Sequence, residues 1–528
     1  MNLKKETYNI WIPLLYVLVA LIPVMVLRDF SPANELRYLS IADEAIQNGT
    51  YFTFTNHGIP YADKPPLYLW IVMFGKWLFG SHCMWFLSLF SLIPAFVIVL
   101  VMDRWARHEI QPQFRVDSML LTLTCGLFTG MAVFLRMDML MTMWITLALY
   151  TFYNMQHGIG CRTRQKVLFP IYIFLAVFTK GPMGILIPLV TTTAFLWEKK
   201  ELRQWGRSWG WTTWGILLLF CGAWFLAVWA EGGKDYLDNL LFHQTVNRAV
   251  NSFHHKRPFW YYLVSMWYTF MPWAFLLIGA VVAGFIRKTR VRNDIDFFFL
   301  TAAVTTLMML SFISSKIQVY LLPAYPFFCY LGAIYMSRYP QSGWVKAAIA
   351  IPAVIICVAG VSLKMISDME ELSYLGHPLF ITAGIILSAT AALSLWFLFK
   401  RKKTNLAVRA MACGLLGAIF VGGLAVPSIN DRAGYRIISE KAAEISDTSA
   451  KPIFTYAMRR PENMDVFLGS RNFTIVEKND TIGVDTLTNA VVIVADNAVD
   501  RFKNDKKTRI GADWIVVIDR QDSAPDKQ

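Results

Sequence analysis

Apolar runs close to twenty residues long recur from residue 10 to residue 427, and they decide what this chain of 528 residues can fold into. A helix needs about twenty apolar residues to cross the hydrocarbon core of a bilayer. Hydrophobic residues make up 56% of the chain and charged residues only 16%, whereas soluble proteins have about 25% charged residues. We therefore predict a polytopic α-helical membrane protein. The expected spans, thirteen in number, are 10–27, 83–102, 117–135, 139–156, 167–179, 182–197, 210–230, 259–286, 295–313, 317–336, 345–362, 378–399 and 408–427.

The lysines and arginines predict how these spans are oriented. A net charge of +14 could indicate nucleic-acid binding, but the basic residues fall in short loops between apolar runs, such as 162–166, 199–207 and 400–403. These loops all lie on one side of the membrane if there are thirteen spans, and the positive-inside rule makes that side the cytoplasm. We therefore predict no nucleic-acid partner, a cytoplasmic N-terminus and an extracytoplasmic C-terminus.

The composition changes after residue 427. We predict a transmembrane domain over 1–427 and a small α/β domain over 428–528, because charged residues and short β-type runs replace the apolar spans there. The expected strands are 453–456, 474–477, 491–495 and 514–518.

Motifs for nucleotides and structural metals are absent from the sequence. The seven cysteines include no CxxC pair, so neither a zinc site nor a disulfide framework is indicated. A Walker loop and a GxGxxG fingerprint are also missing, so we expect no nucleotide cofactor.

Unusual charges gather in the loops of the predicted outer face, above all 28–82 and 231–258. A charge within reach of a span is costly and is usually functional or paired. From Asn34 to Gly49 the apolar spacing predicts a helix. Taken alone, this stretch could also be an amphipathic helix that only lies on the lipid interface. The convergence of several charges on one face favours one wall of an active site.

The residue types on this face suggest chemistry on a phosphate. The carboxylates Glu35, Asp63 and Asp138 could act as a general base or hold a divalent cation through oxygen ligands. Cations can bind a phosphate and neutralise it as it leaves. The candidate cations are Arg37, Lys64, Lys180, Arg248 and Lys316. Because nucleoside triphosphates are not available outside the cytoplasm, this combination suggests a lipid-phosphate donor.

Six short motifs resemble those of the GT-C superfamily of lipid-linked-sugar-dependent glycosyltransferases. They are closest to the branch that holds the lipid A aminoarabinose transferases and the protein O-mannosyltransferases. The motifs are NELRY at Asn34–Tyr38, DKP at Asp63–Pro65, MD at Met137-Asp138, TKGP at Thr179–Pro182, HHKRPFWYYL at His254–Leu263 and SSKIQVYLLPAYP at Ser314–Pro326. Their order and spacing match that branch over about 330 residues.

The resemblance implies a role for each matching residue. Glu35 and Asp138 are expected to be catalytic, although the family's first acidic residue is Asn34 here and an amide cannot act as a base. The residues expected to bind the lipid phosphate or the sugar are Arg37, Tyr38, Lys64, Lys180, Arg248, Lys316 and Tyr320. Ligands for a divalent metal ion could come from Asp63, Glu35 and His255. Simpler roles also stay open, because Arg136 could merely pair with Asp138 and Lys180 could cap a span.

The resemblance also implies a function. A sugar would leave polyprenyl phosphate for an acceptor at the outer face of the bacterial inner membrane, the acceptor being lipid A, a protein or another envelope glycan. The alternative from another class is a transporter or flippase of lipid-linked saccharides. A transporter needs polar or broken-helix sites near mid-membrane, often in repeated halves. The span interiors are largely apolar and no repeat is visible, which favours the enzyme.

Overall fold

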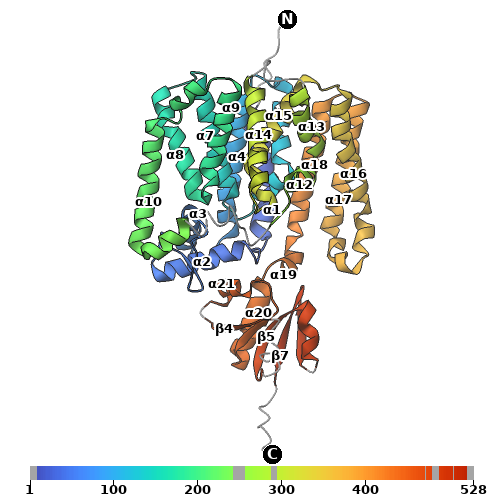
Figure 1. Ribbon diagram of the computed structural model, residues 1–528. Coiled ribbons are helices and arrows are strands. Elements are labelled where there is room, and N and C mark those ends of the chain that lie inside the picture. Colours follow the sequence, from blue (N-terminus) through green and yellow to red (C-terminus); the bar gives the residue numbers. More distant parts are fainter. Residues whose placement is uncertain are drawn as a thin grey trace, which may run out of the picture.

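The computed structural model describes residues 9–241, 256–286, 294–469, 471–477, 487–503 and 505–519. Apolar helices stand side by side in one bundle, and a small β-sheet lies at one end of it (Figure 1). Within the described residues, seven helical segments are long and apolar enough to cross a membrane. They are Met84–Ala106, Trp211–Leu241, Asp294–Phe312, Gln318–Arg338, Gly343–Ser367, Pro378–Phe399 and Thr404–Leu424.

These long helices and several shorter ones form the bundle together. In chain order, the bundle helices are α1 (Trp11–Leu27), α3 (Leu67–Phe79), α4 (Met84–Ala106), α5 (Arg115–Leu123), α6 (Gly126–Met131), α7 (Asp138–Gln156), α8 (Arg162–Lys180), α9 (Met183–Glu198), α10 (Trp211–Asp238), α12 (Tyr261–Thr269), α13 (Ala274–Ile286), α14 (Asp294–Phe312), α15 (Tyr325–Arg338), α16 (Gly343–Ser367), α17 (Pro378–Phe399) and α18 (Thr404–Leu424). The mostly helical membrane architecture is confirmed, while the count of thirteen spans stays a prediction.

Two of the expected continuous spans are broken helices. The span expected at 117–135 divides into α5 and α6, and the span expected at 259–286 divides into α12 and α13. The two breaks meet, because the backbone N–H of Gly126 donates to the carbonyl oxygen of Met271 at 2.8 Å. The indole of Trp273 also donates to the hydroxyl of Thr124 at 3.0 Å. A β-carbon at Gly126 would lie 3.0 Å from that same carbonyl oxygen, so glycine permits this close approach.

The helix α2 (Glu35–Asn48) lies across the end of the bundle, between the bundle and the sheet (Figure 1). It ends as expected at Gly49, whose φ of 68° is a left-handed conformation that favours glycine. A small hairpin of β1 (Thr55–Asn56) and β2 (Ile59–Pro60) follows. The carboxylate of Glu44 holds this hairpin by accepting from Thr55 and from the backbone N–H groups of His57 and Gly58.

The C-terminal residues form a five-stranded sheet with the order β4-β3-β5-β7-β6. Its strands are β3 (Ile453–Tyr456), β4 (Phe473–Val476), β5 (Ala490–Ala495), β6 (Lys506–Ile510) and β7 (Asp513–Ile518). The four expected strands are confirmed, and β6 was missed because its sequence KKTRI is mostly charged. It forms as an edge strand by antiparallel pairing with β7, a position where charged side chains are common.

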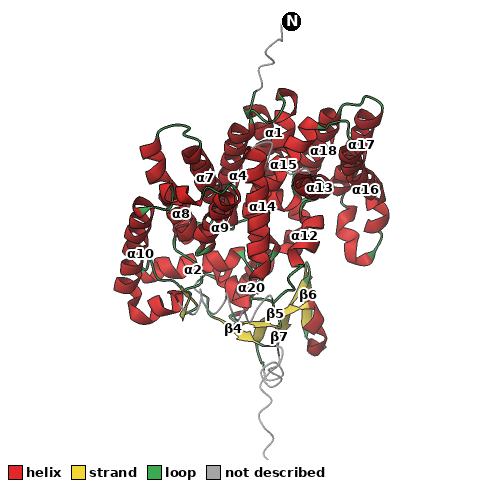
Figure 2. Cartoon of the chain, turned by 45° about the horizontal axis from the view of Figure 1, so that its top comes forward, coloured by secondary structure: helices red, strands yellow, loops and turns green. Residues whose placement is uncertain are grey.

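The sheet and the bundle share an apolar core. One cluster of buried side chains joins Leu39 of α2 and Tyr68 of α3 to Ile438 of α20 (Arg436–Ser449) and Val491 of β5. The view in Figure 2 shows α20 and the strands close to α2. Polar contacts secure the same junction, since the Ser40 hydroxyl donates to Asp465 at 2.6 Å. The sheet is therefore held against the end of the bundle that carries α2.

Candidate active site

Asp138 is the centre of a buried charge cluster at this end of the bundle. Its side chain is 1% exposed, and it accepts a hydrogen bond from Nε of Arg136 at 3.0 Å. The ammonium of Lys180 donates to its other oxygen and lies 4.5 Å from the ring centre of Tyr320. Two cations and an aromatic face thus surround one carboxylate.

Helix geometry explains why these side chains meet. Asp138 is the first residue of α7, where a negative charge is favourable, and Lys180 is the last residue of α8, where a positive charge is favourable. A short connection joins α7 to α8 at their far ends and makes them neighbours. The start of α7 and the end of α8 therefore lie together.

Glu35 does not provide the free carboxylate that we expected from the sequence. It is fully buried and forms a two-pronged ion pair with Arg28, with nitrogen–oxygen distances of 2.6 and 2.7 Å. Its oxygens also accept from the backbone N–H groups of Ser31 at 2.7 Å and Leu135 at 2.9 Å. Four donors occupy the carboxylate, so the structure shows Glu35 in a positioning contact, and its expected catalytic role stays a prediction.

Arg28 is a residue of this network that the sequence reading missed. Its guanidinium also lies 4.4 Å from the ring centre of Phe134. Through Arg28 and Glu35, the end of α1 and the start of α2 hold the turn that precedes Arg136 and Asp138. The available signal was a lone arginine directly after the first apolar span. Its partner seven residues away could not be deduced from spacing alone.

Arg37 and Tyr38 lie on α2, and Lys64 lies in the turn before α3. The ammonium of Lys64 pairs with its neighbour Asp63 at 2.8 Å and is near enough to Lys180 to repel its charge. The Arg37 guanidinium lies 6.0 Å from the ring centre of Tyr61, and its buried Nε has no hydrogen-bond partner among the described residues. Tyr38 is buried and packs edge-on against Tyr68.

The other predicted substrate-binding residues have different outcomes. The ammonium of Lys316 is 3% exposed and donates to the backbone carbonyls of Arg257 and Ile313. It ties the turn after α14 to the chain before α12, and its expected part in binding the lipid phosphate or the sugar stays a prediction. Tyr320 joins the cluster around Asp138. Arg248 and His255 lie outside the described residues.

The predicted metal ligands do not fit a metal site in the part of the chain that is described. Glu35 is occupied by Arg28 and two backbone N–H groups, and Asp63 by Lys64. No group of three potential His, Cys, Asp or Glu ligands is found among the described residues.

Glu231 forms a second structural contact that the sequence did not reveal. Its carboxylate, near the end of α10, accepts from the backbone N–H groups of Tyr51, Phe52 and Thr53 and from the Thr53 hydroxyl at 2.7 Å. The loop between α2 and β1 is thereby fastened to α10.

We expect Glu231→Ala to loosen this loop, because three backbone donors lose their acceptor at once. The expected loss is about 1–3 kcal/mol of unfolding free energy, with faster proteolysis between residues 50 and 61. Thermal unfolding and limited proteolysis in detergent would measure both. The control is Glu440→Ala on the exposed side of α20, and equal behaviour of the two variants would contradict the prediction.

No protein-family model matches this chain. It is 26% identical over 440 residues to the undecaprenyl phosphate-alpha-4-amino-4-deoxy-L-arabinose arabinosyl transferase of Edwardsiella ictaluri, covering 80% of this chain and 78% of that protein. The protein of the same name from Erwinia tasmaniensis is 26% identical, with 75% and 71% covered.

Solved structures agree in fold. The crystal structure of ArnT from Cupriavidus metallidurans bound to undecaprenyl phosphate superposes with a TM-score of 0.75, at 18% identity, over 97% of this chain and 99% of that one. Its apo form gives a TM-score of 0.74. The expected resemblance is therefore confirmed: in sequence and in fold, this chain is similar to the GT-C polyprenyl-phosphate-sugar glycosyltransferases of the aminoarabinose-transferase branch.

Proposed function

We propose that this protein is an integral-membrane glycosyltransferase that moves a sugar from a polyprenyl-phosphate donor to an acceptor of the bacterial envelope, with lipid A as the acceptor. The observation that carries the proposal is the buried Asp138 between Arg136 and Lys180, with Lys64 close by. The chain that carries this charge cluster is similar to proteins named undecaprenyl phosphate-alpha-4-amino-4-deoxy-L-arabinose arabinosyl transferase. The names of these relatives favour transfer over transport of lipid-linked saccharides.

The cluster suits the chemistry of a leaving phosphate. In the transfer, the bond between the sugar's anomeric carbon and the phosphate oxygen breaks, and a bond from that carbon to an acceptor oxygen forms. Negative charge grows on the polyprenyl phosphate as it leaves. Lys64 and Lys180 are placed to stabilise that charge, and preorganised cations in a water-poor site do so effectively.

Asp138 has two tasks in this proposal. It keeps Arg136 and Lys180 charged and oriented within a buried setting, and each of its oxygens retains a lone pair that can accept from an acceptor hydroxyl. Where the acceptor is a hydroxyl group, its proton can pass to Asp138 as the new bond forms. A phosphate acceptor is already deprotonated and needs no base.

The distribution of charge along the sequence suggests the orientation. The basic loops favour a cytoplasmic N-terminus. The end of the bundle with α2, the charge cluster and the sheet would then face the periplasm. This side suits an enzyme whose donor is lipid-linked and whose acceptor is an envelope component.

Mass spectrometry of lipid A from cells with and without this gene tests the function. We expect a glycosyl-sized mass to be present on lipid A only when the gene is present. If the glycosyl-sized mass is lost from a protein or another glycan instead, that molecule is the acceptor and lipid A is not. An unchanged set of glycans, with lipid-linked sugar accumulating in the cytoplasmic leaflet, would overturn the enzyme in favour of the transporter.

Lys64→Ala tests the phosphate contact. We expect transfer to fall at least about tenfold, or about 1.4 kcal/mol of barrier, because a cation is removed from the leaving phosphate. Transfer rates in detergent micelles across donor concentrations would measure it. The control is Lys76→Ala, which removes a lysine of α3 that pairs with Asp43 of α2. Equal rates for the two variants would contradict a phosphate contact of Lys64.

A further inference from the structure

The C-terminal sheet contains a topological switch point. Strands β3 and β5 are adjacent and parallel. After β3 the chain continues to β4, which lies toward one edge of the sheet. After β5 it continues to β6 and β7, which lie toward the other edge. In open α/β sheets, ligands bind outside the carboxyl ends of two such strands, where their connections diverge.

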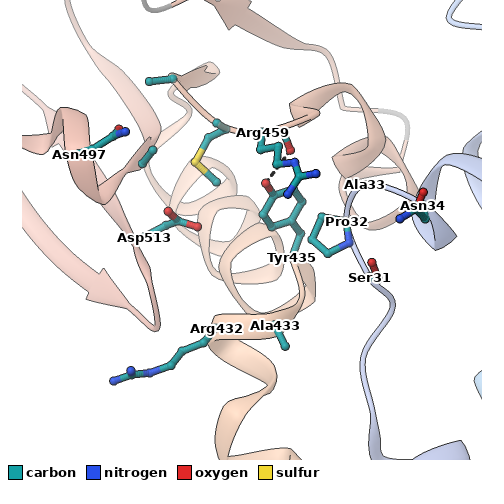
Figure 3. A pocket seen from close by; sticks show the side chains of 13 residues that line it. Ser31, Pro32, Ala33, Asn34, Arg432, Ala433, Tyr435, Arg459, Asn497 and Asp513 are labelled. Carbon is teal, nitrogen blue, oxygen red and sulfur yellow. Dashed lines mark hydrogen bonds between the residues drawn. The ribbon is translucent and has the colours of Figure 1, made fainter. Parts of the chain in front are cut away.

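A pocket of about 470 Å³ lies at this position (Figure 3). One wall is formed by the residues that follow β3, which include Arg459, and by those that follow β5, which include Asn497. Asp513 at the start of β7 completes this wall. The opposite wall is the α1–α2 connection, 31–34, so the pocket lies between the sheet and the bundle.

The turn that carries Arg459 has an unusual backbone. Ala457 and Arg460 both have φ of 57°, a left-handed conformation that residues with a side chain rarely adopt. Such conformations cluster at ligand-binding and active sites. The hydroxyl of Tyr435 donates to the carbonyl oxygen of Arg459 at 2.7 Å and helps to hold this turn. The backbone is therefore held in a shape that local preference does not favour.

The polar groups at the pocket match a phosphorylated saccharide. Figure 3 shows the side chains of Asp513 and Asn497 on one side of the pocket and that of Asn34 on the other, with Arg459 between them. Carboxylate and amide groups exchange hydrogen bonds with sugar hydroxyls, and a guanidinium can bind a phosphate through two parallel hydrogen bonds. Burial raises the pKa of the Asp513 carboxyl, the effect that a partly enclosed site has on an acid.

The pocket is connected to the charge cluster through α2. Asn34, in the pocket wall, directly precedes Glu35, which accepts from the backbone N–H of Leu135 in the turn before Asp138. A ligand against Asn34 would therefore lie next to the network that positions Asp138. The donor phosphate is assigned to the cluster around Asp138, and the pocket is a separate polar site between the bundle and the sheet. This place suits the polar head of the acceptor.

We propose that this pocket binds the phosphorylated saccharide head of the acceptor, so that the C-terminal sheet selects the acceptor. The inference rests on the proposed function for the identity of the ligand as an acceptor. In this proposal Asn34 binds the acceptor head. Binding needs only a group that can form hydrogen bonds, so an amide can stand where the resembled family has an acidic residue.

Direct binding and transfer are measured separately to test it. Full-length protein in detergent micelles is titrated with glucosamine 1-phosphate as a soluble probe. We expect Arg459→Gln and Asn497→Ala each to weaken binding at least about tenfold. The first variant loses a charge-assisted hydrogen bond to the phosphate, and the second loses a neutral hydrogen bond to the sugar. In transfer assays the same variants should raise the KM for lipid A and leave the KM for the donor unchanged. The matched control is Arg471→Gln, whose exposed guanidinium pairs with Asp447 outside the pocket.

The outcomes separate this inference from the proposed function. Probe binding that is absent in the wild type, or equal in wild type and Arg459→Gln, would overturn the pocket. If transfer to lipid A then still depends on Asp138, the proposed function stands without it. Probe binding that depends on Arg459, in a protein that transfers no sugar, would support the pocket and overturn the function.

Discussion

Asp138→Asn should reduce turnover by at least about tenfold, or about 1.4 kcal/mol of barrier. The substitution keeps the shape of the side chain but removes the charge that Arg136 and Lys180 share. The two cations then repel each other within a buried site, so Lys180 is no longer held beside Tyr320. Transfer rates at saturating donor and acceptor would measure the effect.

The control for this variant must separate lost chemistry from lost stability. Asp103 is also a buried aspartate, and it pairs with Arg115. It lies near the end of α4, far from the site, because the start of α4 at Met84 is the end that contacts Arg28. We expect Asp103→Asn to lower the unfolding temperature while the rate per folded molecule stays near the wild-type value. A wild-type rate in folded Asp138→Asn protein would contradict the role given to Asp138.

Glu35→Ala should be among the most destabilising single changes in the chain. It leaves the Arg28 guanidinium buried without its counter-charge and removes the acceptor of two backbone N–H groups. Breaking a buried ion pair by removing one partner costs about 3–5 kcal/mol. Denaturant unfolding in detergent would measure the loss.

A double variant distinguishes positioning from stability. Replacing both charges, as in Arg28→Met with Glu35→Leu, should recover much of the unfolding free energy, since a buried pair exchanged for apolar residues is often neutral. Transfer should stay impaired, because Leu135 still lacks its acceptor and the turn before Asp138 is released. Recovery of both stability and transfer would show that Glu35 does not position Asp138.

The helices and strands follow from local pattern. Apolar runs near twenty residues, the glycine stop at Gly49 and the short β-type runs of the C-terminal residues depend on neighbours in sequence. The same holds for the placement of charges at helix ends, which put Asp138 and Lys180 into the list of candidate residues. Whether two candidates meet depends on how the helices pack, and the spacing along the chain does not contain this information.

What the sequence determined by itself is the class of the protein, a polytopic helical membrane protein with GT-C motifs, and most of the residues that carry charge near its site. Tertiary structure decided the rest. It paired Glu35 with Arg28 and placed Lys316 where it donates to two backbone carbonyl groups. It also divided two expected spans where Gly126 contacts Met271. It also brought the switch point of the sheet to the residues before α2. The polar outcomes share one physical reason: a buried polar group must find a partner, and the packing of the helices, not the spacing along the chain, decides which partner comes within reach.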